Sequence, residues 1–387
     1  AADLLDRLVE TTDGFVREAA LARYDAAKTR MRGPLLDQVE TLVDGFRYYT
    51  AHDLLERILL HFPQDADFIL QAETCRRLAP QNLVTVTDPV EHLIVRPLIL
   101  STEEAFDGDS YARAAEDSML TRREFSMILE DLYARGYMLI DIRSLVRFEG
   151  GVAKAVPVRL PAGRKPLVMT LEAFNYNVFR WMTGNARNLV LTEAGAIAAL
   201  RGTADGGSSL DPEGDAVGIL NRFIDDHPDF SFDGTRGNLS LTGYEGIFGY
   251  LTDVDQLDDR NEALAAIGLP PVRPSQADMD EASRQVAALC RRLLDTGWTL
   301  SSSTYGFINA GQASEDRVRT DTGKWLAQVG LHTGPTQVLV YPNGSWLKGS
   351  DPRCEFLKEE GFRIFVGNGP AAYLTIGADY LYMDAVP

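Results

Sequence analysis

The chain has 387 residues, of which 45% are hydrophobic, and it contains no apolar run long enough to span a bilayer. Its 38 basic and 56 acidic residues give a formal net charge of −18, which disfavours nucleic acid or an anionic membrane surface as a partner. At roughly 150 residues per domain, this length predicts two or three domains.

The three cysteines, Cys75, Cys290 and Cys354, lie far apart and form no C-x-x-C motif. An odd number of cysteines at such spacing predicts neither a disulfide framework nor a zinc knuckle. We expect all three to be buried thiols.

Residues 1–80 carry apolar side chains at three- and four-residue spacing, which predicts helices. Segment 45–68, GFRYYTAHDLLERILLHFPQDADF, is similar to one helical hairpin of the tetratricopeptide type, with Ala51 in its first helix and Pro63 at its turn. About three such repeats are needed to bury a stable solenoid core. We therefore expect a helical cap over 1–80 rather than a peptide-binding array, with a protein partner at this cap as an alternative role.

From residue 90 to residue 387, predicted strands alternate with predicted helices. Thr121 and Glu124 form a capping box, Ser275 begins the longest helix, and Asp351 precedes a proline at the first position of another. This alternation predicts an α/β fold with a parallel sheet, and about seven units predict closure into a (β/α)7 barrel. The predicted strands cover residues 92–100, 137–142, 166–171, 238–243, 298–303, 337–342 and 363–367.

Segment 201–215, RGTADGGSSLDPEGD, is rich in glycine and aspartate and has no hydrophobic periodicity. It predicts a mobile loop. A phosphate-binding loop is not indicated, because neither a lysine nor a G-x-G-x-x-G spacing is present.

Segment 167–179, LVMTLEAFNYNVF, reads as a short buried strand followed by Glu172. In α/β folds the residues just past the carboxyl ends of strands line the site, so Glu172 is a catalytic candidate, although no second acid stands beside it. The five histidines are scattered and none lies at a predicted strand end. The serines of 301–303 lack a nucleophile motif and are interpreted as a polar pocket wall.

Several aromatic residues also flank predicted strand ends. An aromatic face at such a place can serve as a platform for a sugar ring, with ordinary packing as the alternative. The candidates are Tyr176, Trp298, Tyr305, Tyr341 and Trp346.

From about residue 90 to residue 387, the chain resembles the polysaccharide deacetylases of carbohydrate esterase family four, in particular a longer branch found in Gram-positive bacteria. The resemblance implies a distorted (β/α) barrel of about seven strands. It rests on ordered stretches, which are EHLIVRPLILSTEEAFDGD, TRREFSMILEDLYARGYMLIDI, LPAGRKPLVMTLEAFNYN, FIDDHPDFSF, LTGYEGIFGYLT, DTGWTLSSSTYGFINAG and LVYPNGSW.

Active members of that family hold a zinc or another divalent metal through one aspartate and two histidines. The resemblance places Ala173, Ser303 and Phe307 at these three positions and Glu172 at the position of the general base. A methyl group and a phenyl group donate nothing to a metal, and one neutral hydroxyl cannot hold zinc alone. We therefore expect no metal and no other cofactor. The family's oxyanion turn survives in part as YPNG at 341–344.

These comparisons predict a catalytically inactive, deacetylase-like protein that binds an N-acetylated cell-wall or exopolysaccharide glycan. A partly deacetylated, cationic N-acetylglucosamine polymer would suit the acidic net charge. The aromatic platforms named above would be joined by polar contacts from Glu172, Asn175, Ser303 and Asn343.

Two alternatives stay open at this point. The first is an active carbohydrate N-deacetylase, with Glu172 as a metal-free base or with a metal relocated to Asp253, Asp255, Asp258 and Asp259. The second is an interaction scaffold that works through the helical cap. Family resemblance further predicts an extracellular or envelope-associated protein of a Gram-positive bacterium.

Overall fold

The computed structural model describes residues 14–202 and 207–387. Its internal contacts divide the chain into two compact units, Ala1–Gln81 and Asn82–Pro387. Among the described helices, none has both the length and the apolar character that crossing a membrane requires. Cys75, Cys290 and Cys354 are free and buried, which confirms the prediction of buried thiols.

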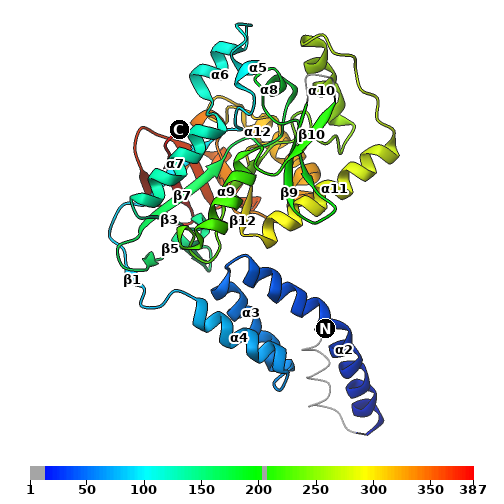
Figure 1. Cartoon of the computed structure of the whole chain (residues 1–387), viewed down its shortest axis with the longest axis vertical. Helices are drawn as coiled ribbons and strands as arrows, with labels where there is room; N and C mark the ends of the chain where they lie inside the picture. Colours follow the sequence, from blue (N-terminus) through cyan, green and yellow to red (C-terminus); the bar gives the residue numbers. More distant parts are fainter. Residues whose placement is uncertain (1–13, 203–206) are drawn as a thin grey trace. The chain divides into compact units, whose positions relative to one another are not determined.

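The described part of the first unit consists of α2 (Phe15–Asp44), α3 (Tyr48–His61) and α4 (Ala66–Leu78) (Figure 1). The side chain of Asp65 caps α4 by accepting hydrogen bonds from the N–H groups of Asp67 and Phe68. The three helices enclose one apolar cluster formed by Val39, Leu42, Ala51, Leu55, Ile58, Phe68, Ala72 and Cys75.

The second unit is built on a curled sheet whose strands follow the order β15-β16-β14-β13-β12-β11-β7-β2, with β3 paired to β7. Neighbours along this path are parallel, except that β15 is antiparallel to β16. The strand bounds are β2 (Glu91–Val95), β3 (Tyr137–Leu139), β7 (Lys165–Leu171), β11 (Gly237–Leu241), β12 (Trp298–Ser302), β13 (Val338–Val340), β14 (Ile364–Asn368), β15 (Tyr373–Ile376) and β16 (Leu381–Ala385).

The sheet's curvature brings β16 next to β2, but the two strands are joined only by one parallel bridge, between Leu93 and Val386. Pairing between β12 and β13 is also limited, to Ser302 with Leu339. The sheet is therefore a half-barrel, and the closed (β/α)7 barrel expected from the sequence is not confirmed.

The predicted strands in this sheet are present, although several are shorter than expected. For example, β2 ends at Val95, two residues before Pro97, whereas the sequence predicted a strand to residue 100. Every residue of β11, and every residue of β7 after Lys165, is buried, as expected for parallel strands covered on both faces.

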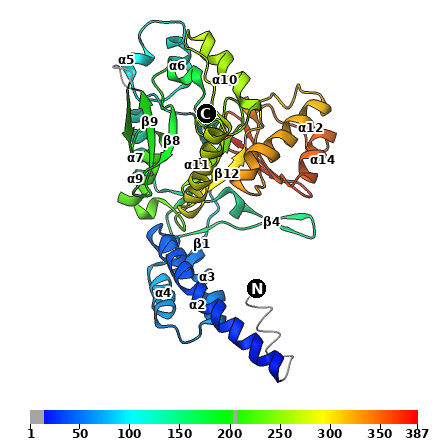
Figure 2. The ribbon, with the colours of Figure 1, turned by 90° about the vertical axis from the view of Figure 1, so that its right-hand side faces the viewer.

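Helices cover this sheet. The capping box of Thr121 and Glu124 and the N-caps Ser275 and Asp351 are confirmed. The long helix α11 packs along β12, and α12 packs against α14 (Figure 2). The helices are α5 (Thr102–Ala105), α6 (Ala112–Ser118), α7 (Arg122–Ala134), α8 (Val178–Trp181), α9 (Ala216–Asp226), α10 (Asp255–Ala266), α11 (Gln276–Asp295), α12 (Glu315–Lys324), α13 (Gly330–Thr333) and α14 (Pro352–Glu359).

Three smaller sheets were not predicted. An antiparallel sheet joins β8 (Asn188–Leu191), β9 (Ile197–Gly202) and β10 (Ser208–Asp211). It corrects the mobile loop expected over 201–215: part of that segment is strand and Asp215 caps α9, while residues 203–206 lie outside the described part. The other two sheets pair β4 (Val146–Glu149) with β5 (Val152–Ala155), and β1 (Val84–Thr85) with β6 (Arg159–Leu160).

Candidate functional site: a polar pocket at the strand ends

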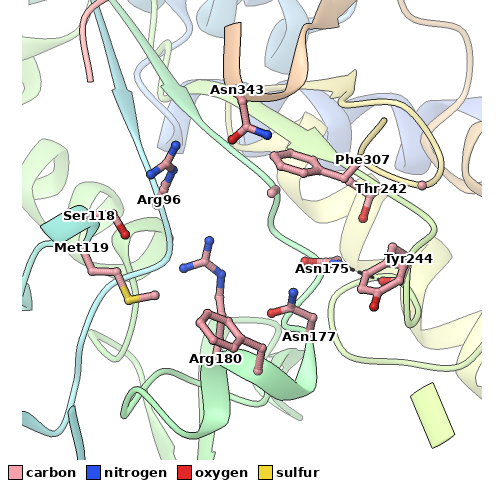
Figure 3. A pocket seen from close by; sticks show the side chains of 13 residues that line it. Arg96, Ser118, Met119, Asn175, Asn177, Arg180, Thr242, Tyr244, Phe307 and Asn343 are labelled. Carbon is pink, nitrogen blue, oxygen red and sulfur yellow. Dashed lines mark hydrogen bonds between the residues drawn. The ribbon is translucent and has the colours of Figure 1, made fainter. Parts of the chain in front are cut away.

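A pocket of about 390 Å³ lies where five parallel strands of the curled sheet end (Figure 3). Its walls come from the segments that follow β2, β7, β11, β12 and β13, together with residues at the end of α6 and in α8. The carboxyl ends of parallel strands are the usual place for a ligand in α/β folds. The lining residues are Arg96, Ser118, Met119, Ala173, Asn175, Asn177, Phe179, Arg180, Thr242, Tyr244, Gly306, Phe307 and Asn343.

Non-glycine residues in the left-handed backbone region concentrate in these strand-end segments. Ala173, Phe307 and Asn343 have φ values of 55°, 49° and 53°. Asparagine tolerates this region, but an alanine or phenylalanine there is strained, and such strain gathers at functional sites. The conformation at Ala173 is held because its N–H donates to the hydroxyl of Ser240 at 3.2 Å. These segments are thus fixed by the surrounding structure.

Glu172, the predicted base, is only 1% exposed and does not line the pocket. Its Oε2 accepts a hydrogen bond from Arg96 Nε at 3.4 Å, and its Oε1 has no partner within the described chain. Burial raises the pKa of this carboxyl, while the nearby Arg96 and Arg180 lower it. The carboxylate is therefore paired with a residue that lines the pocket, Arg96, but does not line the pocket itself.

Arg96 and Arg180 come from different elements and point into the same pocket (Figure 3). Arg96 is the first residue after β2, and Arg180 belongs to α8. Nη1 of Arg180 is buried and has no hydrogen-bond partner in the described residues. Burial and the neighbouring charge of Arg96 lower the pKa of Arg180 to about 10. Two cations thus stand close together at this site.

The loop after β11 holds α8 and the pocket floor in place. The carboxylate of Glu245 accepts the N–H of Val178, the first residue of α8, at 2.7 Å. Asn175 donates its side-chain amide to the carbonyl of Tyr244 at 2.8 Å. Gly243 leaves no room for a side chain, because a Cβ there would lie 2.1 Å from the ring of Tyr305. The segment LTGYEGIFGY is therefore a support for the pocket.

A second buried carboxyl, Asp215, is the N-cap of α9. It accepts hydrogen bonds from the Tyr176 hydroxyl and from the N–H of Ala216. Burial raises the pKa of Asp215 from 3.8 to about 6, against the opposing effects of the Tyr176 hydrogen bond and of Arg180.

Of the residues predicted to contact a ligand, Asn175 and Asn343 line the pocket. Trp346 is 49% exposed, but it does not line this pocket and packs against Tyr382.

The other four predicted platforms do not line this pocket and have buried side chains; they are Tyr176, Trp298, Tyr305 and Tyr341. Each is used in packing: Trp298 donates its indole N–H to Asn221, Tyr341 stacks on Phe365, Tyr305 lies over Gly243, and Tyr176 bonds Asp215.

The three residues that the sequence resemblance placed at metal-ligand positions do not form a donor set. Ala173 and Phe307 line the pocket with carbon only, and the hydroxyl of Ser303, predicted to contact a ligand, is buried and donates to the carbonyl of Val340 at 3.4 Å. The guanidinium groups of Arg96 and Arg180 also line this pocket, and their positive charges would repel a metal cation. These residues do not fit a divalent metal.

Within residues 14–202 and 207–387, the single group of side chains that could share a metal ion lies outside the pocket. The side chains of His52, Asp53 and Glu56 come close enough together to share an ion, but they lie on α3 of the first unit. The acids considered for a relocated metal form no such group among the described residues, and Asp255 instead pairs with Lys324 at 3.2 Å.

Sequence reasoning missed the cationic part of the pocket. Arg96 follows β2 directly, just as Glu172 follows β7, so the strand-end rule that selected Glu172 could also have selected Arg96. No strand-end rule selects the other polar lining residues, because they converge only through the packing of α8 and of the loop after β11. These residues are Asn177, Arg180 and Thr242.

The fold and pocket define a mixed α/β protein with a curled parallel sheet and a polar site at its strand ends. No protein-family model matches the sequence, and no curated protein matches it. A solved structure that resembles this one is a Streptococcus pyogenes deacetylase, PplD, in complex with acetate. The two chains share 12% identity with a TM-score of 0.39, over 79% of this chain and 93% of that chain.

Proposed function

We propose that the chain binds an N-acetylated cell-wall or exopolysaccharide glycan in the strand-end pocket without deacetylating it. One observation carries this proposal. Three lining residues each have a buried polar atom with no partner in the described chain: Asn177 Oδ1, Arg180 Nη1 and Thr242 Oγ1.

Native structures pair nearly all of their buried polar groups, and leaving one unpaired costs about 1–3 kcal/mol. Unpaired atoms that converge on one pocket favour a ligand with several donors and acceptors. A sugar meets this requirement, because its hydroxyl and acetamido groups can satisfy carboxamides and hydroxyls, while Phe307 and Met119 supply apolar contact.

The absence of catalysis is proposed from the side chains at the reacting positions. The residue at the base position, Glu172, is buried and accepts a hydrogen bond from Arg96, and the metal-ligand positions carry a methyl group, a phenyl group and an engaged hydroxyl. Nothing in this set would activate water or polarise an amide. An envelope location and a protein partner at the helical unit remain predictions.

Calorimetric titration with short oligosaccharides of N-acetylglucosamine tests the proposal, with Thr242→Val as the main variant. Valine keeps the shape but removes a hydroxyl that is buried and unpaired, so the free protein should unfold at the same or a higher temperature. Affinity should fall by about two- to tenfold, the value of one uncharged hydrogen bond. Thr29→Val makes the same substitution at an exposed threonine of α2, outside the pocket, and as the matched control it should bind as wild type.

Acetate release is measured in the same samples, with and without added zinc. Release that depends on Glu172 would overturn the non-catalytic proposal and support the deacetylase alternative. No binding, or unchanged affinity in Thr242→Val, would overturn the proposed site.

A further inference from the structure

The two arginines of the pocket have more hydrogen-bonding capacity than their surroundings use. Arg96 makes one long hydrogen bond, to Glu172, and its side chain remains 31% exposed. Arg180 lines the same pocket, and its buried Nη1 has no partner among the described residues. A guanidinium carries five donors in a planar fork, so most of this capacity is directed at what enters the pocket.

The carboxylates near these arginines do not use the remaining guanidinium donors. Glu172 and Asp215 are buried, and neither lines the pocket. Asp215 accepts hydrogen bonds from Tyr176 and Ala216, and Glu172 accepts one from Arg96. The charges that line the pocket are therefore both positive, although the whole chain carries a formal charge of −18.

Two neighbouring cations in a partly desolvated pocket repel one another, and an anion bound between them relieves that repulsion. Planar oxyanions match the fork geometry of arginine and accept two parallel hydrogen bonds. The rest of the lining is neutral: carboxamides from Asn175, Asn177 and Asn343 and hydroxyls from Ser118 and Thr242. At about 390 Å³ the pocket is within the range of small-molecule sites, so a simple anion would leave most of this neutral lining without contacts.

We propose that Arg96 and Arg180 form an anion subsite that selects an acidic glycan, in which a carboxylate, sulfate or phosphate substituent binds the arginines and the neutral part of the sugar binds the asparagines. This inference rests on the proposed function and specifies its ligand. It replaces the cationic polymer expected from the net charge, because the local charge at a site decides recognition at contact distance.

The test compares oligosaccharides of equal length that differ in charge. Hyaluronan fragments alternate N-acetylglucosamine with glucuronate, and chitin fragments contain N-acetylglucosamine alone. Chitin fragments sulfated at the 6-hydroxyl carry the second kind of acidic substituent on the same sugar. Sodium acetate, sulfate and phosphate are titrated separately. We expect the acidic fragments to bind about tenfold or more tightly than chitin fragments at low salt, with the preference shrinking as salt rises.

Arg180→Met keeps the length of the side chain and removes its charge, so it should bring the acidic-to-neutral affinity ratio close to one. Arg180→Lys should retain part of the preference, because it keeps the charge but loses the fork. Arg222→Gln is the control, since Arg222 is exposed and pairs with Asp226 outside the pocket. Thermal unfolding of each variant establishes that it is folded.

Each outcome has a distinct meaning. Equal binding of acidic and neutral fragments, or a preference that survives in Arg180→Met, would overturn the anion subsite and leave the proposed function intact. Binding of simple anions without any oligosaccharide would overturn the proposed function and keep the subsite. Absence of all binding would overturn both.

Discussion

Two arginine–glutamate pairs with a buried glutamate, Arg260 with Glu245 and Arg96 with Glu172, are used differently. In the pair of Arg260 and Glu245, both side chains are nearly inaccessible, at 6% and 2% exposed. Arg260 donates two hydrogen bonds to the carbonyl of Glu245, at 3.0 and 2.5 Å, and the Glu245 carboxylate accepts the N–H of Val178. This pair is engaged with the backbone.

The pair of Arg96 and Glu172 is open by comparison. It consists of one hydrogen bond of 3.4 Å, leaves Oε1 of Glu172 unpaired, and directs a partly exposed guanidinium into the pocket. Whether an arginine–glutamate pair stabilises the fold or is available to a ligand therefore depends on the partners of its remaining hydrogen-bonding groups. Groups whose bonds go to the chain hold the fold, and groups with unused bonds are available to a ligand.

The largest expected effect comes from breaking the engaged pair. Glu245→Ala leaves the Arg260 guanidinium buried without its carboxylate and removes the acceptor for the N–H of Val178. Such a loss should lower the free energy of unfolding by about 3–5 kcal/mol, as measured by urea titration. A loss below about 1 kcal/mol would contradict the structural role of this pair.

The buried carboxyl of Asp215 should produce a pH-dependent effect on stability of about 3 kcal/mol. The pKa of Asp215 is raised from 3.8 to about 6, so the folded protein binds more protons than the unfolded chain between these values. Its contribution to stability is present below about pH 4 and is lost as the pH rises through 6. Asp215→Asn should therefore gain stability relative to wild type across that interval. Urea titrations at several pH values measure the difference, and a constant difference would contradict the raised pKa.

The open pair should tolerate the loss of its carboxylate better than the engaged pair does. Glu172→Ala removes a single long hydrogen bond, and Arg96 can then turn toward solvent or a bound anion. We expect a loss of about 1–2 kcal/mol in the free energy of unfolding, clearly smaller than that of Glu245→Ala. Similar losses in the two variants would remove the distinction between the pairs.

The smallest effect is expected at an exposed pair on α11, which supplies the baseline. Arg284 and Glu281 are 68% and 53% exposed and lie 2.6 Å apart. Exposed pairs contribute little because water and salt screen them. Glu281→Ala should unfold at the same urea concentration as wild type, and a clear shift would show that this baseline is unsuitable.

The interior of the fold was largely predictable from the sequence because its signals are local. Capping residues such as Thr121, Ser275 and Asp351 satisfy backbone donors within the same turn, so they define helix starts wherever the helix packs. The apolar run of β7 likewise predicts a buried strand. Ala173 and Phe307, which do line the pocket, were placed there by family resemblance and not by such local signals.

The composition of the pocket was decided by the tertiary structure. Trp298 and Tyr341 looked like ligand platforms, yet helices and neighbouring strands cover both, since exposure depends on what packs against a residue and not on its position along a strand. Arg96 and Arg180 lie 84 positions apart by number and meet only because β2 and α8 converge on one end of the sheet. The sequence by itself thus determined which segments are helices and buried strands, while the packing of those segments decided which polar groups remain unpaired and face a ligand.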